Sequence, residues 1–342
     1  MRRPTIADVA RKAEVSTATV DRVINGRVTV REETVKRVYA AAHELGYHAA
    51  GLIRQRLDAN LPTCTFGFLL TKSDQHFYRV LGEAFERATR DSNLVRGWPV
   101  VEFVEDNASG EIAHRLREMG KRVDAIAAVS ADHPRVTEVI EDLRAKGVPV
   151  FSLLSDFSNQ YRAGYVGVDN RKAGRAAAWA ISRISREPGK VALFVGTHRF
   201  LGHEMREMGF RTYFREYAPS FEILDSQINL EEPRISYEET LQLLRKHPDL
   251  VGINVAGGGM EGVIEALRDT KPRRNIVVVC NEITPETRAA LADGVVTMVI
   301  ATPIEQLATE LVSIMANAVR GTGDSPPKQT FIPFNITISE NI

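Results

Sequence analysis

The chain has few side chains in the combinations that catalysis or metal binding needs. His203 and Glu204 form an adjacent pair of a base and an acid that could exchange a proton with a substrate. His198 lies five residues before His203, a spacing that differs from the usual zinc-binding motifs. We therefore expect a protein that is not an enzyme and needs no metal or other cofactor.

Three glycines fit a different chemistry, the binding of a nucleotide. Gly257-x-Gly259-x-x-Gly262 lies between an apolar run and a helical pattern, and Glu282 ends the next apolar run. In dinucleotide-binding folds such glycines approach the pyrophosphate and the acid binds a ribose, but the motif falls in the first turn of the fold, not late in the chain. A nucleotide-sensing regulator or an NAD-binding protein is therefore the alternative function.

Polar residues follow several apolar runs, where parallel strands would end. Ligands of such folds bind at the carboxyl ends of the strands, so these residues are the candidate ligand contacts. They are Asp74, His76, Phe77, Asp132, Ser155 and Asp156, and later His203, Glu204, Asn254, Asn281 and Glu282. Phe77 would stack on a sugar ring while carboxylates and amides accept hydrogen bonds from its hydroxyl groups. The predicted ligand is a small carbohydrate-like effector.

Eight apolar runs after residue 62 must position these side chains. They are TFGFLL, VVEFVE, AIAAVS, PVFSLL, KVALFVG, LVGINV, NIVVVC and VTMVIA, and helical patterns alternate with them. This alternation predicts an α/β fold with parallel sheets that helices cover on both faces. A segment of about 280 residues is too long for one sheet, so we expect two lobes with a cleft between them. A (β/α)8 barrel is the competing fold.

The front of the chain has another pattern, that of three short helices. Thr5-x-x-Asp8 is a capping box for the first helix, and Ser16 can cap the second after a turn of two residues. Thr29-x-x-Glu32 opens the third helix. Each helix has one apolar face, so the three close a small core. The short turn favours a helix-turn-helix, and a packing module without a nucleic acid partner is the alternative.

The second of these helices carries the candidate DNA contacts. In a helix-turn-helix its first turns enter the major groove, where Thr17 and Ala18 would touch base edges and Arg22 would reach a guanine. The residues placed to meet phosphates are Thr5, Ser16, Thr19 and Asn25. Residues 1–60 hold eleven Lys and Arg against seven Asp and Glu, a surplus that suits a phosphate backbone.

These residues carry a family resemblance. TIADVARKAEVSTATVDRVINGR resembles the start of the LacI/GalR family of bacterial transcription regulators, and HELGYHAAGLIRQRL resembles the end of that family's third helix and its hinge. The resemblance implies a homodimer whose recognition helices bind a palindromic operator in double-stranded DNA. Asp21 stands where the family usually has serine near a phosphate. A carboxylate there either lowers the affinity or orients Arg22 or Arg27.

The hinge departs from the family pattern. Ala49 and Ala50 replace the usual Pro-Asn, and Arg56 takes the place of a leucine that wedges into the minor groove. Either the neighbouring Leu57 is the wedge, or Arg56 enters a narrow minor groove. The predicted domains are a DNA-binding domain at 1–47, a hinge at 48–61 and an effector-binding and dimerisation domain at 62–342.

The resemblance extends to the second part of the chain. GYVGVDNRKAGRAAA resembles the crossover into the second lobe of the periplasmic sugar-binding-protein fold, which argues against a barrel. Glu204 stands at the family's sugar-binding arginine, Arg206 matches an arginine with a packing role, and Asn281 replaces an acid that commonly contacts the sugar. Gly257 and Gly258 replace Asn-Asp. The resemblance therefore implies an effector unlike the familiar sugars, such as a polyol or an amino-sugar.

The sequence also indicates the cellular location and the oligomeric state of the protein. The chain has no apolar run of eighteen residues, and MRRPTIADVA lacks the apolar segment of a secretory signal. Cys64 and Cys280 lie in apolar runs, which suits buried thiols in a reducing compartment. We expect a cytoplasmic protein with no membrane partner.

TFIPFNITISENI predicts a strand, not the leucine-rich helix that makes some family members tetramers, so we expect a dimer. The predicted function is transcriptional regulation, in the form of an effector-controlled repressor.

Overall fold

The computed structural model describes residues 4–25, 30–53, 61–105, 108–157, 160–321 and 329–342. The chain forms two compact units, residues 1–64 with 91–97 and residues 65–90 with 98–342. In the described ranges no helix is both long and apolar enough to cross a membrane.

In the described part of the first unit, residues 50–53 are helical and three longer helices pack around a small core. They are α1 (Ile6–Lys12), α2 (Thr17–Asn25) and α3 (Glu32–Glu44). Val9, Val20 and Val38, one from each helix, have no exposed surface. The capping box at Thr5 is confirmed, because Asp8 N donates to Thr5 Oγ1 and Thr5 N donates to Asp8 Oδ2. The predicted cap of the third helix, Thr29, lies outside the described residues, and the N-cap of α3 is Arg31, whose side chain makes no capping hydrogen bond.

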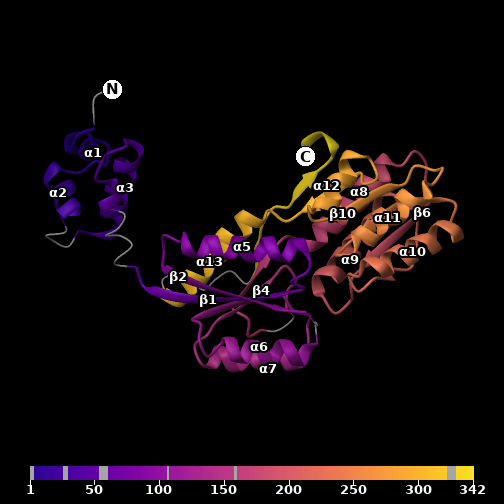
Figure 1. The fold of residues 1–342 in the computed structure, drawn as a ribbon, viewed down its shortest axis with the longest axis horizontal. Coiled ribbons are helices and arrows are strands. Elements are labelled where there is room, and N and C mark those ends of the chain that lie inside the picture. The colour runs from indigo at the N-terminus through magenta and orange to yellow at the C-terminus, as the bar shows by residue number, and fades with distance from the viewer. Residues whose placement is uncertain (1–3, 26–29, 54–60, 106–107, 158–159, 322–328) are drawn as a thin grey trace. The chain divides into compact units, whose positions relative to one another are not determined.

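The first sheet belongs to the second unit and forms one lobe. Its strands are β1 (Thr63–Thr71), β2 (Arg96–Val104), β3 (Ala125–Ala128), β4 (Val150–Leu153), β5 (Gly164–Gly167) and β12 (Gln329–Phe331), in the order β12-β5-β4-β3-β1-β2. Figure 1 shows α5 (His76–Arg90) and α13 (Ile304–Arg320) on one face and α6 (Ser109–Met119) and α7 (Pro134–Ala145) on the other. Strands β3, β4 and β5 are buried throughout, as parallel strands covered on both faces should be.

The second sheet forms the other lobe of the same unit. Its strands are β6 (Lys190–Val195), β7 (Glu222–Ile223), β8 (Gln227–Ile228), β9 (Leu250–Val255), β10 (Val277–Asn281), β11 (Met298–Ala301) and β13 (Asn335–Thr337), in the order β13-β11-β10-β9-β6-β7, with β8 also paired to β6. The helices around it are α8 (Asn170–Ile184), α9 (Leu201–Tyr217), α10 (Pro233–Lys246), α11 (Met260–Thr270) and α12 (Pro285–Ala292), and the 3-10 helix η1 (Ser339–Asn341) follows β13.

Two of these helices, α8 and α9, pack closely enough to hold ligand-binding residues in place. A Cβ on Gly174 of α8 would lie 1.9 Å from the carbonyl oxygen of Arg206 on α9, so only glycine permits this approach. The contact brings the start of α8 beside the first turns of α9. It therefore sets the distance between Asn170 and Arg206, which bond to each other in the pocket described below.

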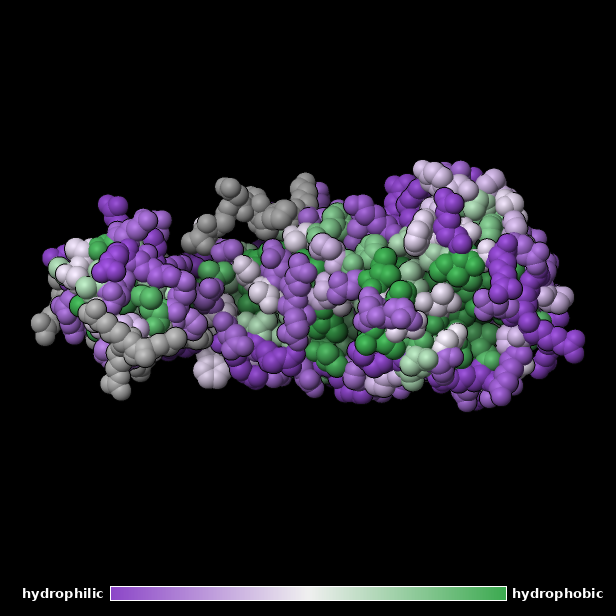
Figure 2. Space-filling view, turned by 90° about the horizontal axis from the view of Figure 1, so that it is seen from above, coloured by the Kyte–Doolittle hydropathy of each residue, from purple (hydrophilic) through white to green (hydrophobic). Residues whose placement is uncertain are grey.

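The two open sheets decide between the predicted folds. The chain passes from one sheet to the other after β5, after β11 and after β12. The two-lobed prediction is confirmed, the barrel is excluded, and all eight predicted runs are strands. The end of the chain forms two short strands in different sheets where one was predicted, because residues 332–334 cross between the lobes. In the space-filling view, apolar residues show among the polar ones on the face that is seen (Figure 2).

Candidate functional site

A pocket lies at the carboxyl ends of strands from both sheets. It contains about 640 Å³ of empty space, part of it open to solvent. The residues that line it are Gln75, Phe77, Tyr78, Val129, Leu154, Ser155, Asn170, Phe200, Gly202, His203, Arg206, Glu231, Gly257, Gly258, Met260, Asn281 and Glu282. In each sheet the strand order reverses here, at β1 and at β6, where open α/β sheets bind ligands.

The first lobe contributes an aromatic wall from the start of α5. The rings of Phe77 and Tyr78 meet edge to face with centroids 5.3 Å apart. Burial raises the pKa of the Tyr78 phenol, and the negative charge of Glu231 raises it further, so the hydroxyl stays protonated. This wall offers an apolar surface to a ligand, with a hydroxyl donor at its edge.

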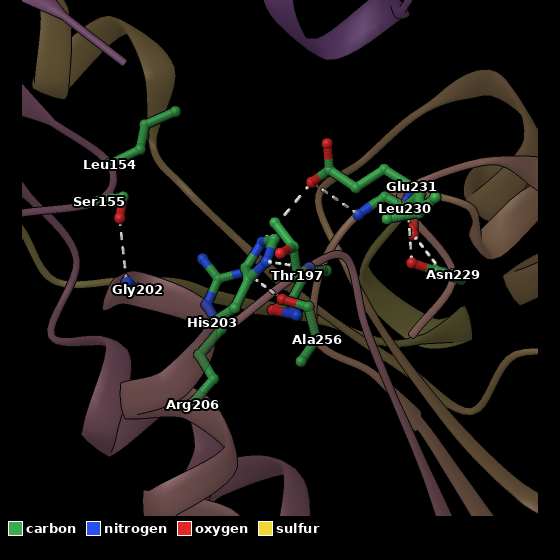
Figure 3. A network of polar contacts seen from close by, with 12 residues as sticks. Leu154, Ser155, Thr197, Gly202, His203, Arg206, Asn229, Leu230, Glu231 and Ala256 are labelled. Carbon is green, nitrogen blue, oxygen red and sulfur yellow. Dashed lines mark hydrogen bonds and ion pairs between the residues drawn. The ribbon is translucent and has the colours of Figure 1, made fainter. Parts of the chain in front are cut away.

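The second lobe contributes a guanidinium that its neighbours hold in place. Arg206 Nε donates to Asn170 Oδ1 at 2.7 Å, and Nη1 donates to the carbonyl oxygen of Ala256 at 2.6 Å (Figure 3). Among the residues that the structure describes, none accepts a hydrogen bond from Nη2. Arg206 therefore keeps one donor group for a ligand in a fixed orientation.

His203 lies one helical turn before Arg206 on the same face of α9. The residue is 9% exposed, and burial lowers the pKa of its imidazole. The charge of Glu231 opposes this shift and that of Arg206 adds to it, so the pKa stays below its ordinary value and the imidazole is neutral. Nδ1 accepts from Thr197 N at 3.4 Å, which places the proton on Nε2. Nε2 lies 3.5 Å from Glu231 Oε1, and Lys72 Nζ lies 3.6 Å from Glu231 Oε2.

Asn281 ends β10 and Glu282 follows it, and both line the pocket. The Glu282 carboxyl accepts hydrogen bonds from Thr302 N at 2.8 Å and Thr302 Oγ1 at 2.7 Å. Burial raises its pKa, against the opposing charge of Arg206. Asn281 donates to the carbonyl oxygen of Val255 at 3.0 Å, which leaves its amide oxygen as an acceptor. These two side chains therefore give this part of the pocket oxygen atoms that can accept hydrogen bonds.

Three lining residues have backbones in the left-handed region. Leu154, Glu231 and Glu282 have φ of 62°, 59° and 65°. Such a conformation costs a residue with a side chain about 1–3 kcal/mol and is concentrated at functional sites. The strain supports the pocket as the site of function, independently of its shape.

The structure brings five of the predicted ligand contacts to the pocket. They are Phe77, Ser155, His203, Asn281 and Glu282. The six that do not line it are Asp74, His76, Asp132, Asp156, Glu204 and Asn254. The strand ends therefore meet at one pocket, and the role of these five residues in ligand binding stays a prediction.

The side chains of two of these six residues point away from the pocket because of their places in the fold. Asp156 is 8% exposed and binds Ser152, Arg162 and Gln329, so its carboxylate is used within the first lobe. Glu204 follows His203 by one residue on α9, a rotation of about 100° that puts it on the exposed face.

The other four lie near the pocket without lining it. Asn254 is inside β9 and is 1% exposed, with an amide oxygen that no described residue bonds. Asp132 N donates across the cleft to the carbonyl oxygen of Arg199 at 3.1 Å. Asp74 is exposed, and His76 begins α5.

Sequence reasoning missed several polar residues of the pocket: Gln75, Tyr78, Asn170, Arg206 and Glu231. Arg206 follows His203 by three residues on one helix face, a spacing that could have identified it. The family resemblance implies a packing role for Arg206. In the structure it bonds its neighbours and also lines the pocket. Glu231 follows β8, a strand of two residues that the apolar pattern does not reveal.

The glycine motif has a packing explanation. Gly257 and Gly258 line the pocket, and Gly258 N donates to Glu231 Oε1 at 3.4 Å, so a protein carboxylate takes the place expected for a pyrophosphate. A Cβ on Gly262 would lie 1.8 Å from the carbonyl oxygen of Pro233, so this glycine allows α10 and α11 to pack. The acid expected to bind a ribose, Glu282, holds Thr302. These contacts do not favour the nucleotide alternative.

The predicted acid–base pair is not assembled. His203 faces Glu231, while Glu204 lies about 100° around the helix, on its exposed face. His198 Nε2 lies 2.8 Å from Glu207 Oε2, outside the pocket. Within the described part of the chain, no three His, Cys, Asp or Glu side chains are grouped to hold a metal.

The second candidate site is the exposed face of α2. Thr17, Ala18, Asp21, Arg22 and Asn25 are exposed on it. Asp21 Oδ1 accepts from Asn25 Nδ2 at 2.7 Å, so in this structure it orients Asn25 where Arg22 was expected. Arg27, Arg56 and Leu57 lie outside the described residues.

The predicted phosphate contacts of this unit also serve as caps. Ser16 Oγ accepts from Thr19 N at 3.1 Å and bonds the Thr19 hydroxyl at 2.9 Å. Thr5 Oγ1 donates to Asp8 Oδ2 at 2.7 Å. These side chains fix the ends of α1 and α2 at the surface where a phosphate backbone would pass.

Comparison with known proteins gives two family matches. Residues 5–49 match the family described as bacterial regulatory proteins, lacI family, and residues 66–323 match the periplasmic binding protein domain. The HTH-type transcriptional regulator MalR of Streptomyces coelicolor is 29% identical over 65% of this chain and 63% of its own length. Catabolite control protein A of Priestia megaterium is 29% identical over 62% and 61%. The transcriptional repressor PurR of Pectobacterium carotovorum is 32% identical over 58% of each. The chain thus spans less than two thirds of the length of these relatives.

Solved structures share the fold of the second unit. A periplasmic solute-binding protein of Actinobacillus succinogenes with bound D-allose superposes with a TM-score of 0.74 at 18% identity, over 81% of this chain and 98% of that one. GanP, a glucose-galactose binding protein of Geobacillus stearothermophilus, superposes with a TM-score of 0.72 at 20% identity, over 81% and 99%.

Proposed function

This chain belongs to the lacI family of bacterial regulatory proteins and carries a periplasmic binding protein domain, and from that premise we propose that it is a transcriptional repressor controlled by a small effector. The proposal places it in the cytoplasm, bound to double-stranded operator DNA. The observation that carries it is the pairing of an exposed helix-turn-helix face with a polar pocket in one chain.

The face of α2 supports DNA recognition. Thr17, Ala18 and Arg22 are exposed on its first turns, and Ser16 caps the start of the helix. In the proposed complex Arg22 donates to a guanine in the major groove while Thr17 and Ala18 contact base edges. Asn25, held by Asp21, lies toward the phosphates.

The pocket supports a carbohydrate-like effector. Phe77 offers a ring for stacking, Arg206 and Tyr78 offer donors, and Glu282 and Asn281 offer acceptors. A polyhydroxylated ligand satisfies both kinds of group, since each hydroxyl donates and accepts. The relatives solved with D-allose and similar sugars bind them in the same fold, which supports this class of effector.

Contacts across the cleft provide the route from effector to DNA. Lys72 Nζ donates to the carbonyl oxygen of Leu230 at 2.8 Å, and Gly202 N donates to Ser155 Oγ at 3.0 Å. An effector between the lobes would add to these contacts and shift the population toward the closed form. In a dimer this shift would move the first lobes and alter the hinge within 48–61, and with it the operator affinity.

A homodimer follows from the palindromic operator that we propose. Two edge strands leave apolar side chains at the surface, which a second copy could cover. Ile336 and Ile338, in and next to β13, are 44% and 40% exposed, and Trp98 of β2 is 61% exposed. Sedimentation of the purified chain tests this assembly.

Selection of random double-stranded DNA by the purified protein, at a stated salt concentration, tests the function. We expect a palindrome whose half-sites lie about one helical turn apart. Enrichment of no sequence by a folded dimer, with and without a panel of sugars and polyols, would contradict the proposal. The recovered operator then serves as the probe with which effectors are screened.

A further inference from the structure

The side chain of Glu231 lies in a slot that three glycines keep open. It is 9% exposed. A Cβ on Gly196 would lie 2.6 Å from Glu231 Cγ, one on Gly258 would lie 3.0 Å from Glu231 Cβ, and one on Gly257 would lie 3.3 Å from Oε1. The first distance is too short for two carbons, so the slot depends on the glycine at 196.

The groups around the carboxylate are those that bind an anion. Lys72 Nζ lies 3.6 Å from Oε2, His203 Nε2 lies 3.5 Å from Oε1, and Gly258 N donates to Oε1 at 3.4 Å. Gly258 precedes α11 by two residues, so the carboxylate also faces the positive end of a helix dipole. An ammonium, a ring N–H and a backbone N–H at a helix start are common ligands of phosphate and carboxylate groups.

The backbone holds Glu231 in this position. Leu230 and Glu231 have φ of 51° and 59°, a left-handed conformation that disfavours residues with side chains. Leu230 N donates to the carbonyl oxygen of Gly196 at 3.0 Å, and Glu231 N donates to Asn229 Oδ1 at 2.9 Å. Asn229 in turn donates to the carbonyl oxygen of Gly258 at 2.8 Å. The backbone and these hydrogen bonds therefore fix the carboxylate in the wall of the pocket.

We propose that Glu231 is a specificity-determining residue whose carboxylate occupies the anion position at this end of the pocket. An effector must then present hydrogen-bond donors here, such as hydroxyl groups, and a phosphorylated or carboxylated compound is rejected. A ligand phosphate would lose the three donors that Glu231 uses and would face its negative charge. This inference rests on the effector pocket proposed above and narrows the class of its ligand.

The test measures the binding of inorganic phosphate to the full chain at constant ionic strength, by titration calorimetry. Glu231→Gly suits the left-handed backbone and empties the slot. We expect it to bind phosphate at least about ten times more tightly than the unaltered chain, a difference of one decade in affinity. Adding Lys72→Met to this variant should remove the gain.

A neighbouring glutamate gives the matched control. Glu232 lies 3.7 Å from Lys72 but its side chain is 57% exposed, so Glu232→Gly should leave phosphate binding as it is in the unaltered chain. Equal phosphate binding by the unaltered chain and the Glu231→Gly variant would overturn the proposal. Should Glu231→Gly not fold, Glu231→Gln must show a gain in the same direction, and an unchanged affinity would overturn the proposal equally.

The outcome is separable from that of the proposed function. Phosphate binding needs no DNA, so a gain in the variant supports the specificity of the pocket even where no operator is found. Conversely, suppose that an operator is recovered and that Glu231→Gly binds phosphate no more tightly than the unaltered chain. The proposed repressor function would then stand, and the proposed role of Glu231 would be wrong.

Discussion

The proposed recognition face of α2 and the pocket between the lobes use similar side chains in opposite ways. On α2 and at its cap, Ser16 bonds Thr19 and Asp21 bonds Asn25, partners three and four residues apart. In the pocket, Arg206 bonds Asn170 and Glu282 bonds Thr302, partners 36 and 20 residues apart. The first surface is exposed and its bonds join near neighbours in the sequence, whereas the second consists of buried and half-buried groups that depend on one another. Substitutions should therefore affect binding alone on α2, but binding and stability together in the pocket.

The largest loss of stability should follow Arg206→Ala. The change leaves Asn170 Oδ1 and the carbonyl oxygen of Ala256 without their donor, which should lower the free energy of unfolding by about 2–4 kcal/mol. Denaturant unfolding measures this, and effector binding should be lost. Glu204→Gln, on the exposed face of the same helix, is the control and should change stability by less than about 0.5 kcal/mol. Equal stability of the two variants would contradict the interdependence of the pocket groups.

Asp156→Asn should destabilise the second unit by about 2–3 kcal/mol at neutral pH. Burial opposes ionisation of the Asp156 carboxyl, but hydrogen bonds from Arg162, Ser152 and Gln329 outweigh it and hold its pKa below the ordinary value. The contribution is therefore complete above the unfolded-state pKa of about 4 and is lost as the pH falls through the lower folded-state pKa. Unfolding curves of both proteins over a pH series should converge on acidification, and a constant difference would contradict this origin.

Thr5→Ala should have a smaller, local effect. Removal of the N-cap hydroxyl leaves the Asp8 amide of α1 without its side-chain acceptor, at a cost of about 1 kcal/mol. Hydrogen exchange in the whole protein should show faster exchange in α1 and unchanged exchange in β9 and β10. Faster exchange in those strands would mean that the two regions do not respond separately.

Arg22→Ala should have the smallest effect on stability, less than about 0.5 kcal/mol, because the side chain is exposed. Its effect on DNA should nevertheless be clear, since a lost guanine contact removes about 1–3 kcal/mol of base discrimination. Selection of operator sequences by the variant checks this. A retained preference at every operator position would show that another residue reads the groove.

The same contrast explains which residues could be predicted. The helix-turn-helix was predictable because its caps, turn and apolar faces repeat within a few residues, and Thr5 and Ser16 cap as expected. The strands were predictable because buried parallel strands are continuous apolar runs. Asp156 and Glu204 were chosen as polar residues at such ends, yet one is used by Arg162 and the other faces solvent.

The sequence by itself determined the regulator family, the order of its parts, the two-lobed α/β fold and the strand ends that line the pocket, since each follows from local periodicity, capping and motif spacing. Only the tertiary structure decided which side chains face the pocket. Glu231 joins Lys72 and His203 from three separate segments, and the glycines at 196 and 258 make room for it. Such a group forms only when distant segments pack, and packing depends on contacts that no local pattern in the chain records.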